Sequence, residues 1–460
     1  VEAQVTLAPI ASEDEHELSG IAATDLKMSS IEILTTTVGS LPRPPWMVPY
    51  LRGEKELPAD WEQTLHKETV KVMKEQLDVG LKVINDGELA RGDYVSEARK
   101  RMSGFDAESI APGAADLEES TEFSDKFQGR KGLLTLTKKT EVKAAACSAP
   151  PTYLEEGLQD LKKEINRVVK AAQELGHPLE RVFFTSPSPG TLATFFGNEF
   201  YKGERGYEDF VSALGKAMAL EYKTIQEAGL ILQVDCPDLG MGRHTKHMDK
   251  TLEEFKEVAK WHVKVLNEAV AGLDPTRLRM HMCWGNYPGP HDKDVPLKEI
   301  ANIVLEAAPG LLSVEACNPG HAHEHEVWGK DDIKVPDNKT FLPGVIDTTS
   351  SHVEHPELVK QRLHQYVVAL RVAKSKRERD NGIAPEESAT KRRRCTPYIP
   401  PLMACTDCGF GTAAGANNLT RELVFKKIAA MCKGAKLLEE ELKAEAAAFE
   451  IRKDNSAMGA

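Results

Sequence analysis

Apolar, β-branched segments alternate with amphipathic stretches along most of this chain, and this alternation limits the possible folds more than any other feature. Eight segments have the composition of buried strands, at residues 31–38, 82–85, 181–185, 230–235, 277–281, 311–315, 340–346 and 399–404. Helical patterns occupy residues 61–79, 153–175, 207–228, 252–271, 297–307, 356–373 and 419–445. Strands that are nearly all followed by helices predict an α/β fold, a single (β/α)8 TIM barrel.

The 460-residue chain exceeds the roughly 250 residues that are usual for such a barrel. Residues 1–30 are acidic and polar, and predict a flexible N-terminal arm before a barrel domain at 31–450. Residues 95–150, after the second strand, lack clear periodicity and predict an insertion, which could form a hairpin near 133–138. Residues 374–397 are rich in charge and predict a solvated polar loop.

The composition excludes several classes of function. With 59 basic and 71 acidic residues the net charge is −12, which argues against nucleic acid or an anionic membrane as a partner. No apolar run approaches the roughly 20 residues that span a bilayer, and residues 1–30 lack the apolar segment of a signal peptide. The eight cysteines are scattered rather than arranged as a disulfide framework, so we expect a cytoplasmic protein, with a homo-oligomer as one possible state.

Polar residues stand where the predicted strands end. In barrels of this kind the active site lies at the carboxyl ends of the strands. The strand ends carry Ser40, Glu88, Asp235, His281, Cys283, Glu315, Asp347 and Cys408. Because these ends meet at one mouth, we expect the side chains to converge there.

His281, Cys283 and Cys408 together supply one imidazole and two thiolates. Zn²⁺ takes such ligands in tetrahedral geometry, and three protein ligands leave one position open for substrate. Glu315 could fill that position at rest and yield it to an incoming ligand. Cys405 competes with Cys408, but Gly409 favours a turn at the rim, so we predict Cys408. Taken alone, the His-x-Cys pair could equally be a buried histidine beside an inert thiol.

A sulfur-rich zinc site with an open position suits the binding of a substrate thiol. Zinc lowers the pKa of a bound thiol, so that a thiolate exists at neutral pH and can attack an alkyl carbon. Hydrolysis by zinc-bound water is the alternative, although such sites are more often rich in histidine and carboxylate.

At these residues the sequence resembles the cobalamin-independent methionine synthase family, in its C-terminal catalytic barrel. The resemblance runs from about residue 31 to 435. The matching segments are Thr-Thr-Val-Gly-Ser-Leu-Pro at 36–42, Gly-Glu-Leu-Ala-Arg at 87–91, Gln-Val-Asp-Cys-Pro at 233–237, His-Met-Cys at 281–283, Ser-Val-Glu at 313–315, Pro-Gly-Val-Ile-Asp at 343–347 and Asp-Cys-Gly at 407–409.

The resemblance implies a zinc enzyme that transfers a methyl group from a folate donor to homocysteine. It implies zinc ligands at His281, Cys283, Glu315 and Cys408. It also implies that Ser40, Glu88 and Asp235 bind homocysteine, with the two carboxylates holding its ammonium group.

The chain also departs from that family. The family's histidine proton donor aligns with Thr349, and the tryptophan that packs on the folate aligns near Phe195. The full-length family enzyme has a second, N-terminal barrel that is absent here, and residues 318–326 are richer in histidine than we expect. This pattern looks more like the single-barrel branch of the superfamily, which includes the epoxyalkane:coenzyme M transferase and attaches thiols to other electrophiles.

Further residues could complete the site. His352 and His355 follow the seventh strand and, with Asp347, could supply the acid that is missing at Thr349; alternatively, His355 simply starts the next helix. Arg243 could bind an anionic substrate group or face water.

The histidines at positions 321, 323 and 325 could form a second metal site or a proton-donor cluster, but a solvated loop is the favoured interpretation.

The sequence thus predicts a zinc-dependent alkyl transfer, most simply of methyl, to a zinc-activated thiol. The alternatives are thiol addition to an epoxide or another electrophile, and a non-catalytic barrel that only binds zinc. A zinc-free decarboxylase of the uroporphyrinogen type is more remote, because it would not need the Cys and His ligands.

Overall fold

The computed structural model describes residues 31–111, 113–120, 122, 143–382, 398–416 and 419–458. The expected arm at 1–30, the expected hairpin near 133–138 and most of the expected polar loop, residues 383–397, lie outside this part of the chain.

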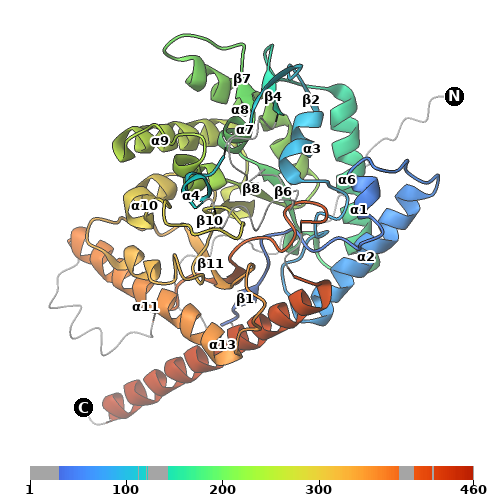
Figure 1. Ribbon diagram of the computed structural model, residues 1–460. Helices are drawn as coiled ribbons and strands as arrows, with labels where there is room; N and C mark the ends of the chain where they lie inside the picture. Colours follow the sequence, from blue (N-terminus) through green and yellow to red (C-terminus); the bar gives the residue numbers. More distant parts are fainter. Residues whose placement is uncertain are drawn as a thin grey trace.

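A curled sheet of parallel strands forms the centre of the molecule (Figure 1). Its seven strands are β1 (Leu34–Thr35), β6 (Phe183–Pro187), β8 (Ile231–Asp235), β9 (Leu278–Met282), β10 (Leu311–Val314), β11 (Thr340–Ile346) and β12 (Met403–Thr406). They lie in the order β1-β12-β11-β10-β9-β8-β6, and every pair is parallel. The first strand thus lies beside the last, as in a TIM-like barrel, and the α/β class is confirmed.

The second predicted strand is the exception. Residues 82–85 contribute only an isolated parallel bridge, between Ile84 and Val182. The N–H groups of Lys82 and Val83 donate to the carbonyl oxygen of Thr35 at 3.1 and 3.0 Å. This segment therefore lies between β1 and β6, but it is too short to be a regular strand.

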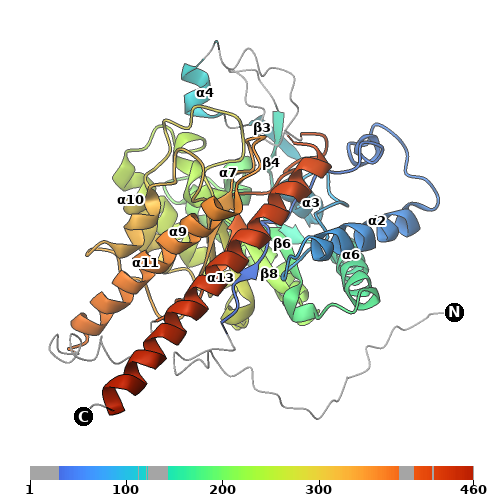
Figure 2. The ribbon, with the colours of Figure 1, turned by 90° about the horizontal axis from the view of Figure 1, so that it is seen from below.

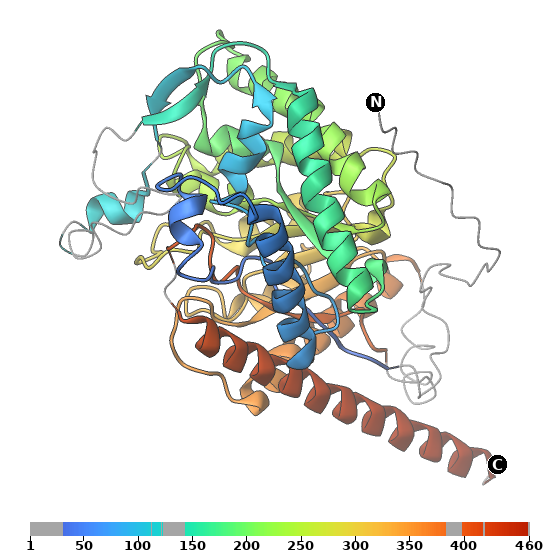
Figure 3. The ribbon, with the colours of Figure 1, turned by 90° about the vertical axis from the view of Figure 1, so that its right-hand side faces the viewer.

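Helices cover the outside of the sheet, as Figures 1 and 3 show. They are α2 (Trp61–Asp78), α6 (Glu155–Glu174), α8 (Gly206–Glu227), α9 (Leu252–Ala269), α10 (Leu297–Leu305), α11 (Pro356–Asp380) and α13 (Arg421–Met458). Helix α6 buries Leu161, Ile165 and Val168, which lie three or four residues apart and so share one face. A capping box between Thr251 and Glu254 starts α9.

Two helices continue further than the sequence predicted. Helix α11 runs on to Asp380, so the assignment of residues 374–380 to a polar loop was wrong. Its last turns are held by side chains, since Lys376 pairs with Asp331 at 2.9 Å and Arg377 donates to the carbonyl oxygen of Val335 at 2.5 Å. Helix α13 continues to Met458, past the predicted end at 445, and crosses the outside of the molecule diagonally (Figure 2).

The described part of the insertion has more regular secondary structure than its lack of periodicity predicted. It contains α3 (Tyr94–Lys100), β2 (Met102–Ser103), β3 (Ala107–Ile110), α4 (Ala115–Glu119) and β4 (Lys143–Cys147), and β5 (Thr152–Tyr153) follows. Strand β3 pairs antiparallel with β4, which also pairs with β7 (Gly197–Asn198). Helix α4 stands out from the body of the protein in Figures 2 and 3.

Two short helices, α1 (Val48–Leu51) and α7 (Pro189–Phe195), also had no counterpart in the sequence prediction. Among the described residues, none of the helices combines the length and the apolar composition that crossing a bilayer requires.

A buried ion pair ties the loop after β11 to α13. The side chain of Lys427 is 0% exposed, and its Nζ lies 2.8 Å from Oε2 of Glu354. The other oxygen of Glu354 accepts from the N–H of Asp347 at 2.9 Å. This pair therefore positions the carboxyl end of β11.

We expect Lys427→Met to lower the free energy of unfolding by about 3–5 kcal/mol, because it leaves the buried Glu354 carboxylate without its partner. Urea unfolding measures this change. Lys426→Met is the matched control, since Lys426 is exposed and, among the residues described, its ion pair is with Glu422 on the same helix. Equal unfolding midpoints for the two variants would contradict the role of the buried pair.

Candidate metal centre

Three soft ligands meet at the carboxyl end of the sheet. His281 and Cys283 come from the end of β9, and Cys408 from the turn after β12. One ligand atom from each lies within 4.8 Å of the other two, and all three residues are buried. Gly409 allows this turn to approach, because a Cβ at this position would overlap Oγ of Ser40. Residues more than a hundred positions apart are thus brought together.

One ring nitrogen of His281 has a hydrogen-bond partner and the other has none among the described residues. Its Nδ1 lies 3.1 Å from Oγ of Ser313, whereas its buried Nε2 has no hydrogen-bond partner among the described residues. Burial, assisted by Arg279, lowers the pKa of His281 to about 3, so the ring is neutral. Buried polar atoms without partners are rare in folded proteins. A neutral imidazole with one oriented nitrogen and one free nitrogen is the state in which histidine binds a metal.

The two thiols contact each other. The hydrogen bond that Cys283 shares with Cys408, together with burial, raises the pKa of Cys283 well above its usual value. Without a cation this thiol therefore stays protonated at neutral pH. A divalent metal would displace the proton, and this donor set of one nitrogen and two sulfurs fits Zn²⁺.

Cys405 lies apart from this group. Its Sγ lies 3.2 Å from the guanidinium of Arg279 and 3.7 Å from Oγ of Ser313. Arg279 also donates to Oγ1 of Thr36 at 3.0 Å, in the segment that follows β1. The structure therefore brings Cys408, and not Cys405, to His281 and Cys283.

Glu315 is beside the cluster but not within it. It is 5% exposed, and burial, with Cys283 as a further cause, raises the pKa of its carboxyl group well above the usual value. The carboxylate accepts from the backbone N–H of Trp284, and the amide of Asn318 lies 3.4 Å from its Oε2. It is not among the ligand atoms that lie within 4.8 Å of one another.

Asp407 joins the two sides of the site. Its carboxylate accepts from the backbone N–H groups of Ala316, Cys317 and Asn318 at 2.8, 3.1 and 2.9 Å. These contacts hold the loop after β10 against the turn that carries Cys408.

Two further buried carboxylates, those of Glu88 and Asp235, interact with each other. Glu88 has a φ of 55°, a strained value for a residue other than glycine, and it accepts from Oγ1 of Thr185 at 2.8 Å. Its Oε2 has no hydrogen-bond partner in the described chain, with the guanidinium of Arg43 3.9 Å away. Asp235 accepts from Gln233 at 2.7 Å, and burial, with Glu88 as the next cause, raises its pKa well above the usual value.

Ser40 is also buried at this mouth. Its carbonyl oxygen accepts from the N–H of Phe410 at 2.8 Å, which attaches the segment after β1 to the turn that carries Cys408.

Sequence analysis missed Tyr94, the first residue of α3. Burial raises the pKa of its hydroxyl well above the usual value, and the next causes are Asp235, Cys283 and Cys408. The phenol therefore lies among these predicted site residues. No sequence signal marks it, because it lies directly before the insertion at 95–150, in a segment without a recognisable motif.

The candidates after β11 make local contacts instead. Asp347 accepts from the N–H groups of Thr349 and Ser350 at 2.8 and 3.2 Å, which forms a turn. His352 is exposed and lies 3.1 Å from Oγ of Ser350. His355 caps α11 by accepting from the N–H of Glu357 at 3.2 Å. This contact agrees with the alternative that His355 simply starts the next helix. The catalytic roles of Asp347, His352 and His355 stay predictions.

Arg243 lies in the short helix η4 (Met241–His244) and is half-buried. Its Nε is buried and has no hydrogen-bond partner among the described residues. Binding of an anionic substrate group by Arg243 stays a prediction.

The histidine-rich loop divides into two parts. His321 is buried, whereas His323 is exposed. Nδ1 of His325 lies 3.0 Å from the carbonyl oxygen of Ala322. Within the described ranges, His281, Cys283 and Cys408 are the one group of side chains that could hold a metal. The second metal site is therefore not supported.

Comparisons with known proteins extend this picture, although no family model matches the chain. The methionine synthase of Saccharolobus solfataricus is 25% identical over 427 residues, covering 90% of this chain and 98% of the relative. That of Sulfurisphaera tokodaii is 25% identical over 427 residues, covering 90% and 96%. These relatives match over nearly their whole length. Proteins named methionine synthase therefore include chains that match this one without a second barrel in the matched region.

Two solved structures share the fold. A B12-independent methionine synthase from Shewanella sp. W3-18-1, in complex with selenomethionine, has a TM-score of 0.60 at 17% identity, covering 90% of this chain and 99% of that one. A putative vitamin-B12-independent methionine synthase from Listeria monocytogenes has a TM-score of 0.51 at 16% identity, covering 88% and 98%. In sequence the chain is similar to proteins named methionine synthase, and in fold it is similar to two structures described as B12-independent methionine synthases.

Proposed function

We propose that this chain is a zinc-dependent transferase that methylates a thiol, with homocysteine as substrate and a methyl-folate as donor. The observation that carries the proposal is the buried His281–Cys283–Cys408 cluster with its unpartnered imidazole nitrogen. The relatives named methionine synthase supply the substrate class, and the B12-independent neighbours favour a donor other than a cobalamin.

His281 through Nε2, Cys283 and Cys408 would hold the zinc, and Glu315 would be the exchangeable fourth ligand. When bound, zinc supplies Lewis acidity that lowers the pKa of a substrate thiol and leaves a nucleophilic thiolate at neutral pH. Glu315 suits an exchangeable role, because the N–H of Trp284 and the amide of Asn318 already hold its carboxylate beside the cluster. These contacts allow it to rest away from the metal when the thiol binds.

Glu88 and Asp235 would hold the ammonium group of the substrate, with Ser40 beside them. Both carboxylates are buried, and burial raises both pKa values because no neighbouring cation compensates fully. An incoming ammonium would supply that charge and favour the ionised carboxylates. It would also orient the substrate so that its sulfur points toward the cluster.

We also propose that residues 82–85 act as the eighth strand and close the sheet into a barrel. Support comes from their bridge to Val182 and the hydrogen bonds to Thr35. Closure would place Glu88 at the same rim as His281 and Cys408.

Thiol addition to an epoxide or another electrophile is the second candidate. Two observations favour it. Thr349, at the position of the family's proton donor, is exposed and bonded to Asp347, and Phe195 is packed in the core. Another residue would then have to donate the proton, and another surface would have to bind the alkyl donor. Measuring turnover with a methyl-folate and with an epoxide distinguishes the two functions.

The zinc ligands can be tested by substitution. We expect Cys408→Ser to lose most of its bound zinc after dialysis against a chelator, because one of three protein ligands is removed. Cys405→Ser is the matched control and should retain zinc, since Cys405 contacts Arg279 instead. Elemental analysis of the purified proteins gives the result, and equal zinc content in both variants would reject the assignment of Cys408.

The thiol can be identified at the metal itself. X-ray absorption at the zinc edge should show one zinc with two sulfur ligands in the resting protein. Addition of homocysteine should raise the count to three, because the substrate thiolate takes the open position. If the set of zinc ligands does not change when homocysteine is added, homocysteine is rejected as the substrate and another thiol is favoured. Absence of zinc would reject the mechanism.

The ammonium site makes a separate prediction. Glu88→Gln should weaken homocysteine binding to the zinc-loaded protein by about 10- to 100-fold, because a charge-assisted hydrogen bond contributes about 1.5–3 kcal/mol. Isothermal titration calorimetry measures the dissociation constant. Glu199→Gln, at an exposed carboxylate that pairs with Lys202, serves as control. Unchanged affinity in Glu88→Gln would place the ammonium elsewhere.

A further inference from the structure

Trp284 links two of the proposed zinc ligands. It follows Cys283 in the chain, and its backbone N–H donates to the carboxylate of Glu315. Its side chain is 0% exposed, and the indole Nε1 donates to the carbonyl oxygen of Val295 at 2.7 Å. The position of this one residue therefore affects both Cys283 and Glu315.

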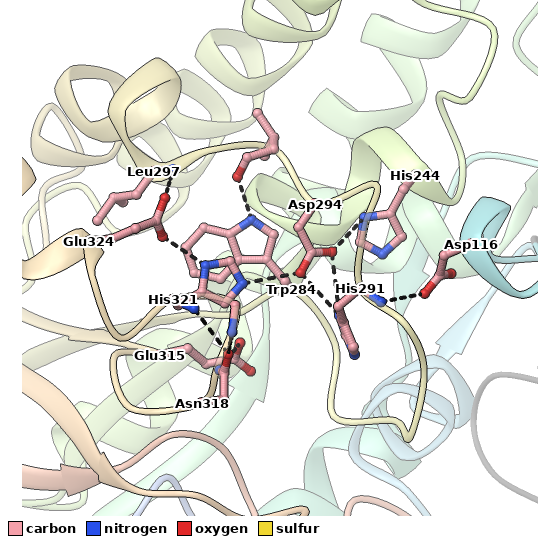
Figure 4. A network of polar contacts seen from close by, with 12 residues as sticks. Asp116, His244, Trp284, His291, Asp294, Leu297, Glu315, Asn318, His321 and Glu324 are labelled. Atoms are coloured by element: carbon pink, nitrogen blue, oxygen red, sulfur yellow. Dashed lines mark hydrogen bonds and ion pairs between the residues drawn. The ribbon is translucent and has the colours of Figure 1, made fainter.

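The imidazole of His321 stacks on the indole of Trp284. The ring centroids are 3.8 Å apart and the ring planes are inclined by 20° (Figure 4). Nδ1 of His321 lies 2.7 Å from Oε2 of Glu324, and its Nε2 lies 3.1 Å from Oδ2 of Asp294. Both partners are carboxylates, so both ring nitrogens donate and the ring is an imidazolium.

The charge on His321 agrees with its surroundings. Burial opposes the charge, but the hydrogen bonds from His321 to Asp294 and Glu324 outweigh it and raise its pKa to about 9. Because both nitrogens already donate, this histidine has no lone pair left for a metal or for a substrate proton. Its role must come from its position and charge.

The two carboxylates that hold His321 are themselves fixed. Glu324 accepts from the N–H of Leu297, the first residue of α10, at 2.6 Å. Asp294 also lies 3.3 Å from Nδ1 of His244 and 3.1 Å from Nδ1 of His291, so three imidazoles surround one carboxylate (Figure 4). The ring of His321 is therefore held rigidly against Trp284.

The backbone of His321 connects to Glu315 by a second route. Its N–H lies 3.1 Å from the carbonyl oxygen of Asn318, and the side-chain amide of Asn318 lies 3.4 Å from Oε2 of Glu315. Two chains of contacts thus lead from His321 to the same carboxylate, one through Trp284 and one through Asn318.

We propose that His321 is a positioning residue for the metal centre: it clamps Trp284 and thereby holds the Glu315 carboxylate beside Cys283, which keeps one metal position available to the substrate thiol. This inference rests on the proposed function. It differs from a merely structural role, because it requires the effect of His321 to pass through Glu315.

The test uses the full-length protein loaded with Co²⁺ in place of zinc, whose absorption reports the ligands. The wild type should show a thiolate-to-cobalt charge-transfer band, and homocysteine should increase it. His321→Gln should keep the band, but half-saturation should require at least tenfold more homocysteine, because the released Glu315 carboxylate competes for the open position. The d–d bands should also shift.

Glu315→Gln isolates the route of the effect. In this background His321→Gln should change homocysteine binding by less than twofold, because the competing carboxylate is already gone. His325→Gln is the matched control, from the same loop and without contact to the carboxylates, and should resemble the wild type. An equal loss in both backgrounds would reduce His321 to a structural role and overturn the inference.

The outcomes separate the two proposals. A wild type without a thiolate-to-cobalt band would reject the metal site and with it the proposed function. A wild-type band with an unchanged response in His321→Gln would reject only the role of His321. If His321→Gln does not fold, Asp294→Asn removes one of the two carboxylates from the same imidazolium, and the same shift is expected; an unchanged response there would likewise overturn the inference.

Discussion

The register between β9 and its two neighbouring strands determines which side chains lie beside His281. Parallel pairing places His281 opposite Asp235 on β8 and opposite Ser313 on β10. Ser313 then contacts Nδ1 of His281, which leaves Nε2 for the cluster. Because side chains alternate along a strand, a shift of one residue would turn His281 away from the mouth. The position of the imidazole of His281 relative to Ser313 and Asp235 depends on this alignment.

Burial without full charge compensation is the second property of the mouth. Glu88, Asp235 and Glu315 are all at most 6% exposed, and burial raises the pKa of each. Carboxylates in such surroundings favour cations, whether a metal ion or an ammonium group. Such burial also lowers the effective dielectric constant, which strengthens each electrostatic contact once a cation is bound. These electrostatics agree with the proposed binding of a zinc ion and of an ammonium group.

The segments outside the barrel pattern are attached to this mouth rather than merely added to the fold. Asp116 of α4 accepts from the hydroxyl of Tyr287 at 2.9 Å and from the N–H of His291 at 3.0 Å. Both partners lie in the loop after Cys283. The histidine-rich loop contributes His321 in the same way, through Asp294 and Trp284. Polar contacts among βα loops therefore connect the insertion, the loop of His321 and the candidate metal centre.

Local sequence patterns were sufficient for the α/β class, the order of most strands and the convergence of His281, Cys283 and Cys408, because strand and helix periodicities are local and parallel strands end at one rim. The sequence predicted Cys408 rather than Cys405 from the turn that Gly409 favours. The tertiary structure supplied the contacts that distinguish the two cysteines, namely the close approach of Gly409 to Ser40 and the contact of Cys405 with Arg279. It likewise decided the order within the insertion, the length of α11 and the burial of His321. Each of these depends on contacts between residues that are distant in the chain, and a local pattern carries no information about such contacts.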